Sequence, residues 1–74
     1  MNFLLPVYYS NLSVAHRALF FEMIISSNKC GGIMLYDKCA SVLYFKTYTY
    51  AFEVLRAIHY NFQFVTVGEI QETN

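Results

Sequence analysis

The hydrophobic and polar positions of the chain fall into short blocks that predict a strand followed by a helix. Residues 3–9 are rich in aromatic and aliphatic side chains and favour a strand. Pro6 cannot donate a ladder hydrogen bond, so we expect it to restrict the early part of this strand to a sheet edge or a strand start. Asn11 and Ser13 are typical helix-capping residues, and residues 14–27 carry apolar side chains at helical spacing.

The remainder of the chain predicts a hairpin, a second helix and a last strand. Gly31-Gly32 ends the first helix, and Asp37-Lys38 fits a two-residue hairpin turn. The expected elements are strands at 33–36 and 39–45, a helix from Thr47 or Thr49 to Asn61, and a strand at 62–67. Gly68 and the polar residues 71–74 predict a fraying tail.

This order of elements predicts an α+β domain with the ferredoxin-like βαββαβ plan. Two helices cover one face of a four-stranded antiparallel sheet in that plan, and the other face stays open. No linker, repeat or low-complexity stretch divides the chain, so residues 1–74 are expected to form a single domain. Met1, two residues before the first strand, suits a natural chain start.

The composition predicts a domain that needs a partner. Of the 74 residues, 57% are hydrophobic and only 14% charged, which is more apolar surface than a core of this size can hide. The first helix is apolar over more than half its circumference. Phe21 and Ile25 are therefore expected on a helix flank, packed either under the terminal segments or against a partner helix or a second copy.

Charge and motif content weigh against several classes of function. The formal net charge is zero and the basic residues are scattered, whereas phosphate binding usually requires a basic stripe. Cys30 and Cys39 lack neighbours at metal-ligand spacing and are expected to be reduced thiols. No catalytic motif includes His16 or His59. We therefore expect no enzyme, no metal and no cofactor.

Apolar runs and the N-terminus indicate no membrane segment or targeting signal. The longest apolar runs fall far short of the ~20 residues that span a bilayer, because Glu22, Asp37 and Lys46 interrupt them. The apolar stretch before Tyr9 is too short for a signal peptide and follows no basic residue. The expectation is a soluble intracellular protein, in the cytoplasm or the nucleus.

The segment Val7-Tyr8-Tyr9-Ser10-Asn11-Leu12 resembles the first-strand motif of RNA-recognition-motif domains, except at Tyr9. Leu19-Phe20 falls where that family's first helix carries a Leu-Phe pair, and Lys38 and Phe45 match the ends of its third-strand octet. The spacing of Ala51, Val54, Leu55, Ile58 and Asn61 resembles the family's second helix and its exit. The resemblance implies an open sheet face that binds a partner, with Tyr8 placed to stack on a base.

The octet departs from the family where bases would stack. The family has glycine second and aromatics third and fifth, but Cys39, Ala40 and Val42 occupy these positions. Alternation predicts Ala40, Val42 and Tyr44 on the open face, with Leu43 and Phe45 against the helices. Pairing across the expected turn adds Ile33 and Leu35 to the open face. Family members that lost these aromatics are protein-binding or dimerising modules, and the resemblance implies that option.

These observations lead to one main hypothesis and two alternatives. The main one is a non-enzymatic binding module that contacts a protein, or a second copy of itself, through an apolar sheet face and the helix flank. The predicted sheet-face residues are Tyr8, Ile33, Leu35, Ala40, Val42 and Tyr44. The first alternative is a single-stranded RNA-binding module that uses Tyr8, Tyr44, Lys38, Lys46 and Arg56. The second is a small viral or mobile-element inhibitor of a host protein.

Overall fold

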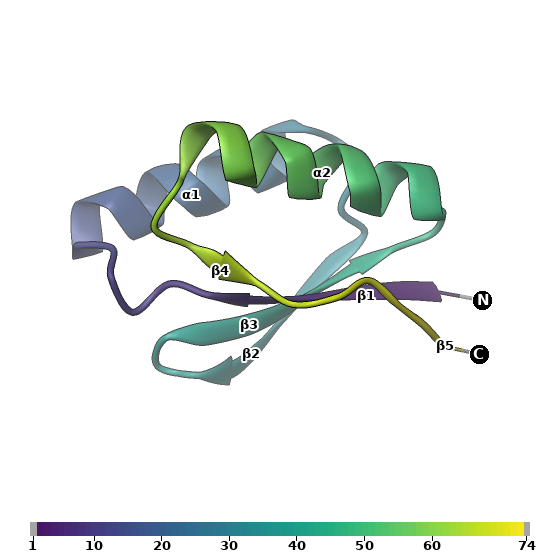
Figure 1. The fold of residues 1–74 in the computed structure, drawn as a ribbon, viewed down its shortest axis with the longest axis horizontal. Coiled ribbons are helices and arrows are strands. Elements are labelled where there is room, and N and C mark those ends of the chain that lie inside the picture. The colour runs from purple at the N-terminus through teal and green to yellow at the C-terminus, as the bar shows by residue number, and fades with distance from the viewer. Residues whose placement is uncertain (1, 74) are drawn as a thin grey trace.

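The computed structural model describes residues 2–73, in which two helices lie on one side of an antiparallel sheet (Figure 1). Ser13 caps the first helix by accepting a hydrogen bond from the His16 amide, and Thr47 caps the second by accepting one from the Tyr50 amide. The elements are β1 (Asn2–Tyr8), α1 (Val14–Ser26), β2 (Gly32–Asp37), β3 (Ala40–Phe45), α2 (Tyr48–Asn61), β4 (Thr66–Val67) and β5 (Gln71–Thr73).

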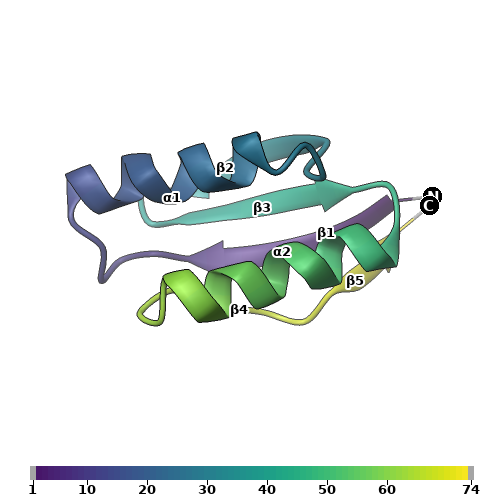
Figure 2. The ribbon, with the colours of Figure 1, turned by 90° about the horizontal axis from the view of Figure 1, so that it is seen from above.

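The described sheet has five strands. Its order is β2-β3-β1-β4, and β5 also pairs with β1, beyond the end of β4. All of these pairings are antiparallel. Seen from above, α1 lies on the β2 and β3 side and α2 on the β1 and β5 side (Figure 2). The predicted α+β class with two helices on one face is confirmed, whereas the expected count of four strands is wrong.

The core fills the space between the helices and the sheet. Alternate residues of β1 and β3 point toward the helices, because successive strand side chains face opposite sides. On the helix side, the core is covered by the buried residues of α1 and α2, which are Phe20, Ile24, Ala51, Val54 and Ile58. The buried residues that form this cluster are Leu5, Val7, Tyr9, Phe20, Ile24, Leu43, Phe45, Ala51, Val54, Ile58 and Val65.

Tyr9, the one position at which residues 7–12 depart from the motif they resemble, is buried and has a partner for its hydroxyl. The ring is 3% exposed and packs edge-on against Phe21, with the ring centroids 5.2 Å apart. Its hydroxyl lies 2.8 Å from the Ser41 hydroxyl, which is also buried. The Arg17 guanidinium lies over the ring, 5.5 Å from its centroid. A tyrosine is therefore accommodated because both its ring and its hydroxyl have partners.

The last strand of the sheet is broken opposite Pro6. β1 is flanked by β3 on one side and by β4 and β5 on the other, so the expectation that Pro6 marks an edge or a strand start is wrong. Proline has no amide hydrogen, and the side of β1 that lacks this donor faces the gap between β4 and β5. Pro6 contributes only its carbonyl oxygen, which accepts a hydrogen bond of 2.9 Å from Gly68.

The pairing register shifts by one residue across this gap. Val7 pairs with Val67, but Leu4 pairs with Gln71, so the C-terminal segment carries one residue more than β1 between these pairs. Such an extra residue is typical of a β-bulge. The predicted strand at 62–67 is therefore reduced to Thr66–Val67. Of the tail that was expected to fray, Gln71–Thr73 forms β5, and Asn74 lies outside the described residues.

Replacing Gly68 with alanine is expected to destabilise the domain by about 1 kcal/mol relative to the same change at Gly32. A Cβ atom at Gly68 would lie 3.2 Å from Cγ of Pro6, whereas at Gly32 the nearest atom would be 4.0 Å away. Both variants reduce the freedom of the unfolded chain equally, so their difference reports the contact with the proline ring. Urea denaturation of both variants measures this difference in the free energy of unfolding. Equal midpoints would show that the proline ring moves aside at no cost in stability.

Candidate docking face of the sheet

The sheet face that the helices leave uncovered carries mostly apolar and aromatic side chains. Leu43 and Phe45 are buried in the core, which turns Ala40, Val42 and Tyr44 to the other face as predicted. The Tyr44 hydroxyl lies 3.8 Å from the Met34 sulfur across the β2–β3 ladder. We call this surface the open face. Its apolar and aromatic residues are Leu4, Pro6, Tyr8, Met34, Tyr36, Ala40, Val42 and Tyr44. The polar residues Thr66 and Gln71 pair with Tyr8 and Leu4 on the same face, and Asp37 pairs with Ala40 at its border.

A hollow lies on the open face where Tyr8 and Tyr36 stand on either side of Ala40. Its volume is about 360 Å³, and Pro6, Val42 and Gln71 complete its lining together with Ser41. Tyr8 is 47% and Tyr36 78% exposed, while Ala40 is only 7% exposed. A small residue between two large aromatic ones therefore creates a recess with an apolar floor and two phenol groups at its rim.

Ile33 and Leu35 do not lie on the open face, which corrects the sequence prediction. Ile33 pairs with the buried Leu43 and packs against the core, and Leu35 pairs with Ser41 on the same side. The hairpin turn consists of Lys38-Cys39 instead of Asp37-Lys38, and a bulge lies between Leu35 and Asp37. Because a one-residue slip reverses every side chain, Met34 and Tyr36 take the places predicted for Ile33 and Leu35.

The two residues of the predicted helix flank differ in exposure. Ile25 is 64% exposed, whereas Phe21 is half-buried and its ring contacts both Tyr9 and Phe20. Ile25 also lies close to Ile33, since the two side chains line one shallow hollow of about 250 Å³. The flank of α1 therefore lies beside β2, on the helix-covered side of the sheet and away from the open face.

The basic residues predicted to contact RNA are divided between the two sides of the domain. Lys38 lies in the exposed hairpin turn, and Lys46 follows β3 and lines a hollow together with Tyr44. Arg56 is exposed on α2, and the buried residues of that helix face the sheet. Because α2 covers the face opposite the open one, Arg56 cannot join Tyr8 and Tyr44 in one binding surface (Figure 1).

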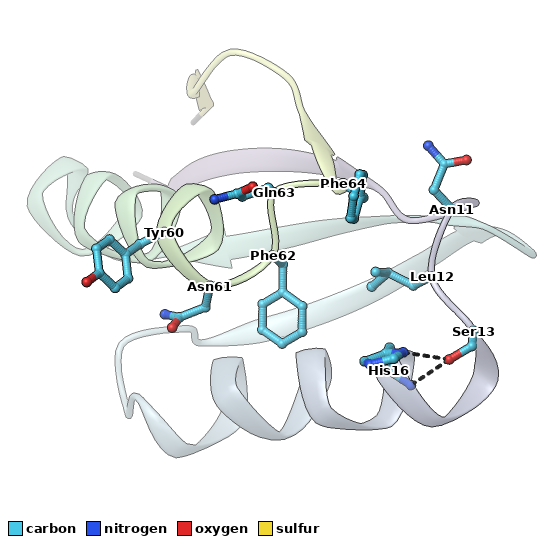
Figure 3. Close-up of a pocket in the computed structure, with 9 residues that line it drawn as sticks. All are labelled: Asn11, Leu12, Ser13, His16, Tyr60, Asn61, Phe62, Gln63 and Phe64. Carbon is cyan, nitrogen blue, oxygen red and sulfur yellow. Dashed lines mark hydrogen bonds between the residues drawn. The ribbon is translucent and has the colours of Figure 1, made fainter.

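A second cavity, of about 520 Å³, lies between the start of α1 and the segment that follows α2 (Figure 3). His16 of α1 lines one side of it and Asn61 of α2 the other (Figure 3), and the Ser13 hydroxyl lies 2.8 Å from Nδ1 of His16. The Ser13 oxygen is also the cap of α1, accepting from the His16 amide at 3.2 Å. No acidic residue lines this cavity, so the serine–histidine pair lacks an orienting carboxylate there and is explained by helix capping.

The described part of the chain contains neither a metal-ligand cluster nor a membrane-spanning helix. Within residues 2–73, no three histidine, cysteine or acidic side chains gather closely enough to hold a metal ion. In the same range, neither helix has the length and apolarity needed to cross a membrane. Comparison of the chain with protein-family models, curated proteins and solved structures found no match.

The open face contains four residues that the sequence prediction missed, namely Leu4, Pro6, Met34 and Tyr36. Alternation from Tyr8 would have identified Leu4 and Pro6, because both share its parity along β1. Met34 and Tyr36 required the bulge in the hairpin, and the hairpin sequence carries no clear signal for it.

Proposed function

We propose that this domain is a non-enzymatic binding module that docks a segment of another protein on the open face. The observation that supports this most strongly is the hollow between Tyr8 and Tyr36, bordered by apolar neighbours. Binding hot spots are enriched in tyrosine and tend to surround pockets that take an apolar or aromatic anchor. One large side chain of the partner would fill the hollow, and Met34 and Tyr44 would contact the residues beside it.

The chemistry of the open face favours a protein over a polyanion. Its eight apolar and aromatic residues carry no charge, and Asp37 and Lys38 at its border have opposite charges, so electrostatic attraction would contribute little to binding. Burying one large apolar side chain contributes about 1.5–3 kcal/mol, which lets a few anchors supply a useful affinity. We therefore expect an affinity that changes little between low and moderate salt.

The proposal also fits a ferredoxin-like domain that resembles RNA-recognition motifs. The strand order β2-β3-β1-β4 with two helices on one face is compatible with that plan, and β5 is an addition to it. The third and fifth octet positions, where the family has stacking aromatics, hold Ala40 and Val42 on the open face. A recess thus replaces the stacking platform, and a recess suits an inserted side chain.

Single-stranded RNA is the second candidate ligand, favoured by one specific observation. Tyr8 and Tyr36 flank the hollow, and Lys38 lies in the turn two residues beyond Tyr36. A base stacked on one of these rings would gain about 1–3 kcal/mol, and Lys38 would contact a phosphate. Tyr44 and Lys46 offer a similar pair at the other end of β3.

Selection of displayed peptides on the immobilised protein tests the proposal and requires no candidate partner. We expect enriched peptides to share an aromatic or large aliphatic anchor. Tyr36→Lys should weaken their binding at least about 30-fold, the effect of losing a hot spot. Tyr60→Lys is the matched control, because Tyr60 is 84% exposed and belongs to α2 on the opposite side.

The same selection separates the candidate ligands. Peptides that bind both lysine variants equally would place docking away from the open face and contradict the proposal. Short RNA oligomers titrated into labelled protein provide the other comparison. Amide shifts confined to Tyr8, Tyr36 and Tyr44 at low RNA concentration, together with no anchored peptides, would favour the RNA-binding alternative.

A further inference from the structure

β2 forms an open edge of the sheet. The strand order places β2 last, so one side of it has no neighbouring strand among the described residues. Alternate residues of an antiparallel strand direct their backbone groups to opposite sides. The Pro6 carbonyl accepts from Gly68 on the side of β1 away from β3, so the neighbouring Leu5 directs its backbone groups to Leu43 of β3. Val42, the next residue of β3, therefore directs its backbone groups to its partner Met34 in β2. This geometry turns the amide and carbonyl groups of Ile33 and Leu35 toward the free side.

The two edges of the sheet differ in how well they are protected. Natural edges avoid pairing with other chains by being short, bulged, charged or interrupted by proline. β4 and β5 meet this description. They contain only two and three residues, and a register shift separates them. Glu69 lies between the two strands, and Glu72 lies within β5. β2 has a bulge between Leu35 and Asp37 and a charge at Asp37, so only its turn end is protected in this way. Residues 32–35, before the bulge, contain no charge and no proline. This part of the β2 edge is therefore open to pairing.

An apolar helix flank lies directly beside this edge. Leu35 is 73% and Ile25 64% exposed, and Ile25 and Ile33 line one hollow. Val14, at 82% exposure, and Phe21 continue the same side of α1 at spacings of seven and four residues. We call these groups together the edge surface. They are the free backbone of Ile33 and Leu35 and the side chains of Leu35, Ile25, Phe21 and Val14.

We propose that a second copy of this chain covers the edge surface, with β2 of one copy paired antiparallel to β2 of the other about a two-fold axis. Such an interface is self-complementary, because the same backbone groups are offered by both copies. The axis also brings the two α1 helices together, because α1 lies on the β2 side of the sheet (Figure 2). A single added peptide strand would satisfy the edge but leave the flank of α1 exposed.

The size of this side of the domain requires the dimer to use nearly all of it. The Cα atoms extend 33 Å along the longest axis and 22 Å across the two layers (Figure 1). The product 33 × 22 gives roughly 700 Å² in projection for the whole side, against about 800 Å² per partner in standard interfaces. Strand pairing alone would cover only part of this side, so the flank of α1 has to contribute. The edge surface and the open face are distinct, so the dimer does not depend on the proposed docking of a protein segment.

Sedimentation equilibrium of the full chain and of three lysine variants tests the dimer. We expect the wild type to approach twice its monomer mass of 8.6 kDa. Leu35→Lys and Ile25→Lys should each raise the dimer dissociation constant about 100-fold, because each change places a charge in an apolar interface. Phe64→Lys is the control, since Phe64 is 72% exposed but lies in the loop between α2 and β4.

Amide exchange identifies the surface that the dimer uses. In concentrated wild type, the amides of Ile33 and Leu35 should exchange at least about 10-fold more slowly than in Ile25→Lys, which retains both amides. A wild type that stays monomeric at millimolar concentration would overturn the proposal. So would a dimer that leaves these amides unprotected, as one built on the open face would, or protection that requires an added foreign peptide. Peptide docking to Tyr36 is measured separately, so either proposal can fail alone.

Discussion

Replacing Phe20 with alanine is expected to remove about half of the folding stability of this domain. Phe20 is fully buried, and its ring meets those of Phe21 and Phe62 edge-on, each with a centroid distance of 5.3 Å. Removing a buried phenylalanine ring costs about 3–5 kcal/mol, because the contacts are lost and a cavity remains. A 74-residue chain has a total free energy of unfolding of only about 4–11 kcal/mol.

Urea denaturation followed by circular dichroism measures this loss. The control is Phe64→Ala, which removes an equally large but 72% exposed ring and should change the free energy of unfolding by less than about 0.5 kcal/mol. If Phe20→Ala cost no more than its control, the core between α1 and the sheet would not be packed as described.

Breaking the buried hydroxyl pair of Tyr9 and Ser41 should have the next largest effect. Tyr9→Phe and Ser41→Ala each leave a buried hydroxyl without its partner, and each is expected to cost about 1–3 kcal/mol. Removing both hydroxyls leaves no buried hydroxyl without a partner. The double variant should therefore lose clearly less free energy of unfolding than the two single variants lose in sum. Chemical denaturation of the three variants completes the cycle, and strict additivity would show that the two hydroxyls do not interact.

Tyr9 also shows why part of this structure could not be predicted from the sequence. An aromatic residue there breaks the resemblance to RNA-recognition motifs, and nothing in the local sequence indicates its partner. Ser41 lies 32 residues away and becomes adjacent only through the register of β1 and β3, in which Val7 pairs with Ser41. Long-range polar pairs of this kind depend on tertiary structure, which local propensity does not encode.

Most element positions could be predicted from local patterns. The caps at Ser13 and Thr47, the helix that ends at Asn61 and the alternation of β3 all follow from neighbouring residues. The break between β4 and β5 could not be predicted, because it depends on Pro6 lying opposite residues near Gly68. The effect of a proline on a neighbouring strand becomes visible only once the pairing is known.

The candidate site was predicted only in part for a similar reason. Ala40, Val42 and Tyr44 were placed correctly because their parity is fixed by the buried Leu43 and Phe45 within one strand. Which side chains of β2 reach the open face depends on the geometry of the hairpin. A single bulged residue places Met34 and Tyr36 there instead of Ile33 and Leu35. The hollow at Ala40 combines both effects, since one of its two tyrosines was predicted and the other was not.

Photocrosslinking in the native cell tests the proposal that a protein docks on the open face. A benzophenone amino acid replaces Tyr8 in one variant and Tyr60 in another. Tyr60 is the more exposed of the two, at 84% against 47%, so accessibility alone would favour the control position. We expect a discrete, protease-sensitive adduct from position 8 and none from position 60. A nuclease-sensitive adduct at position 8, or equal labelling at both positions, would contradict the account.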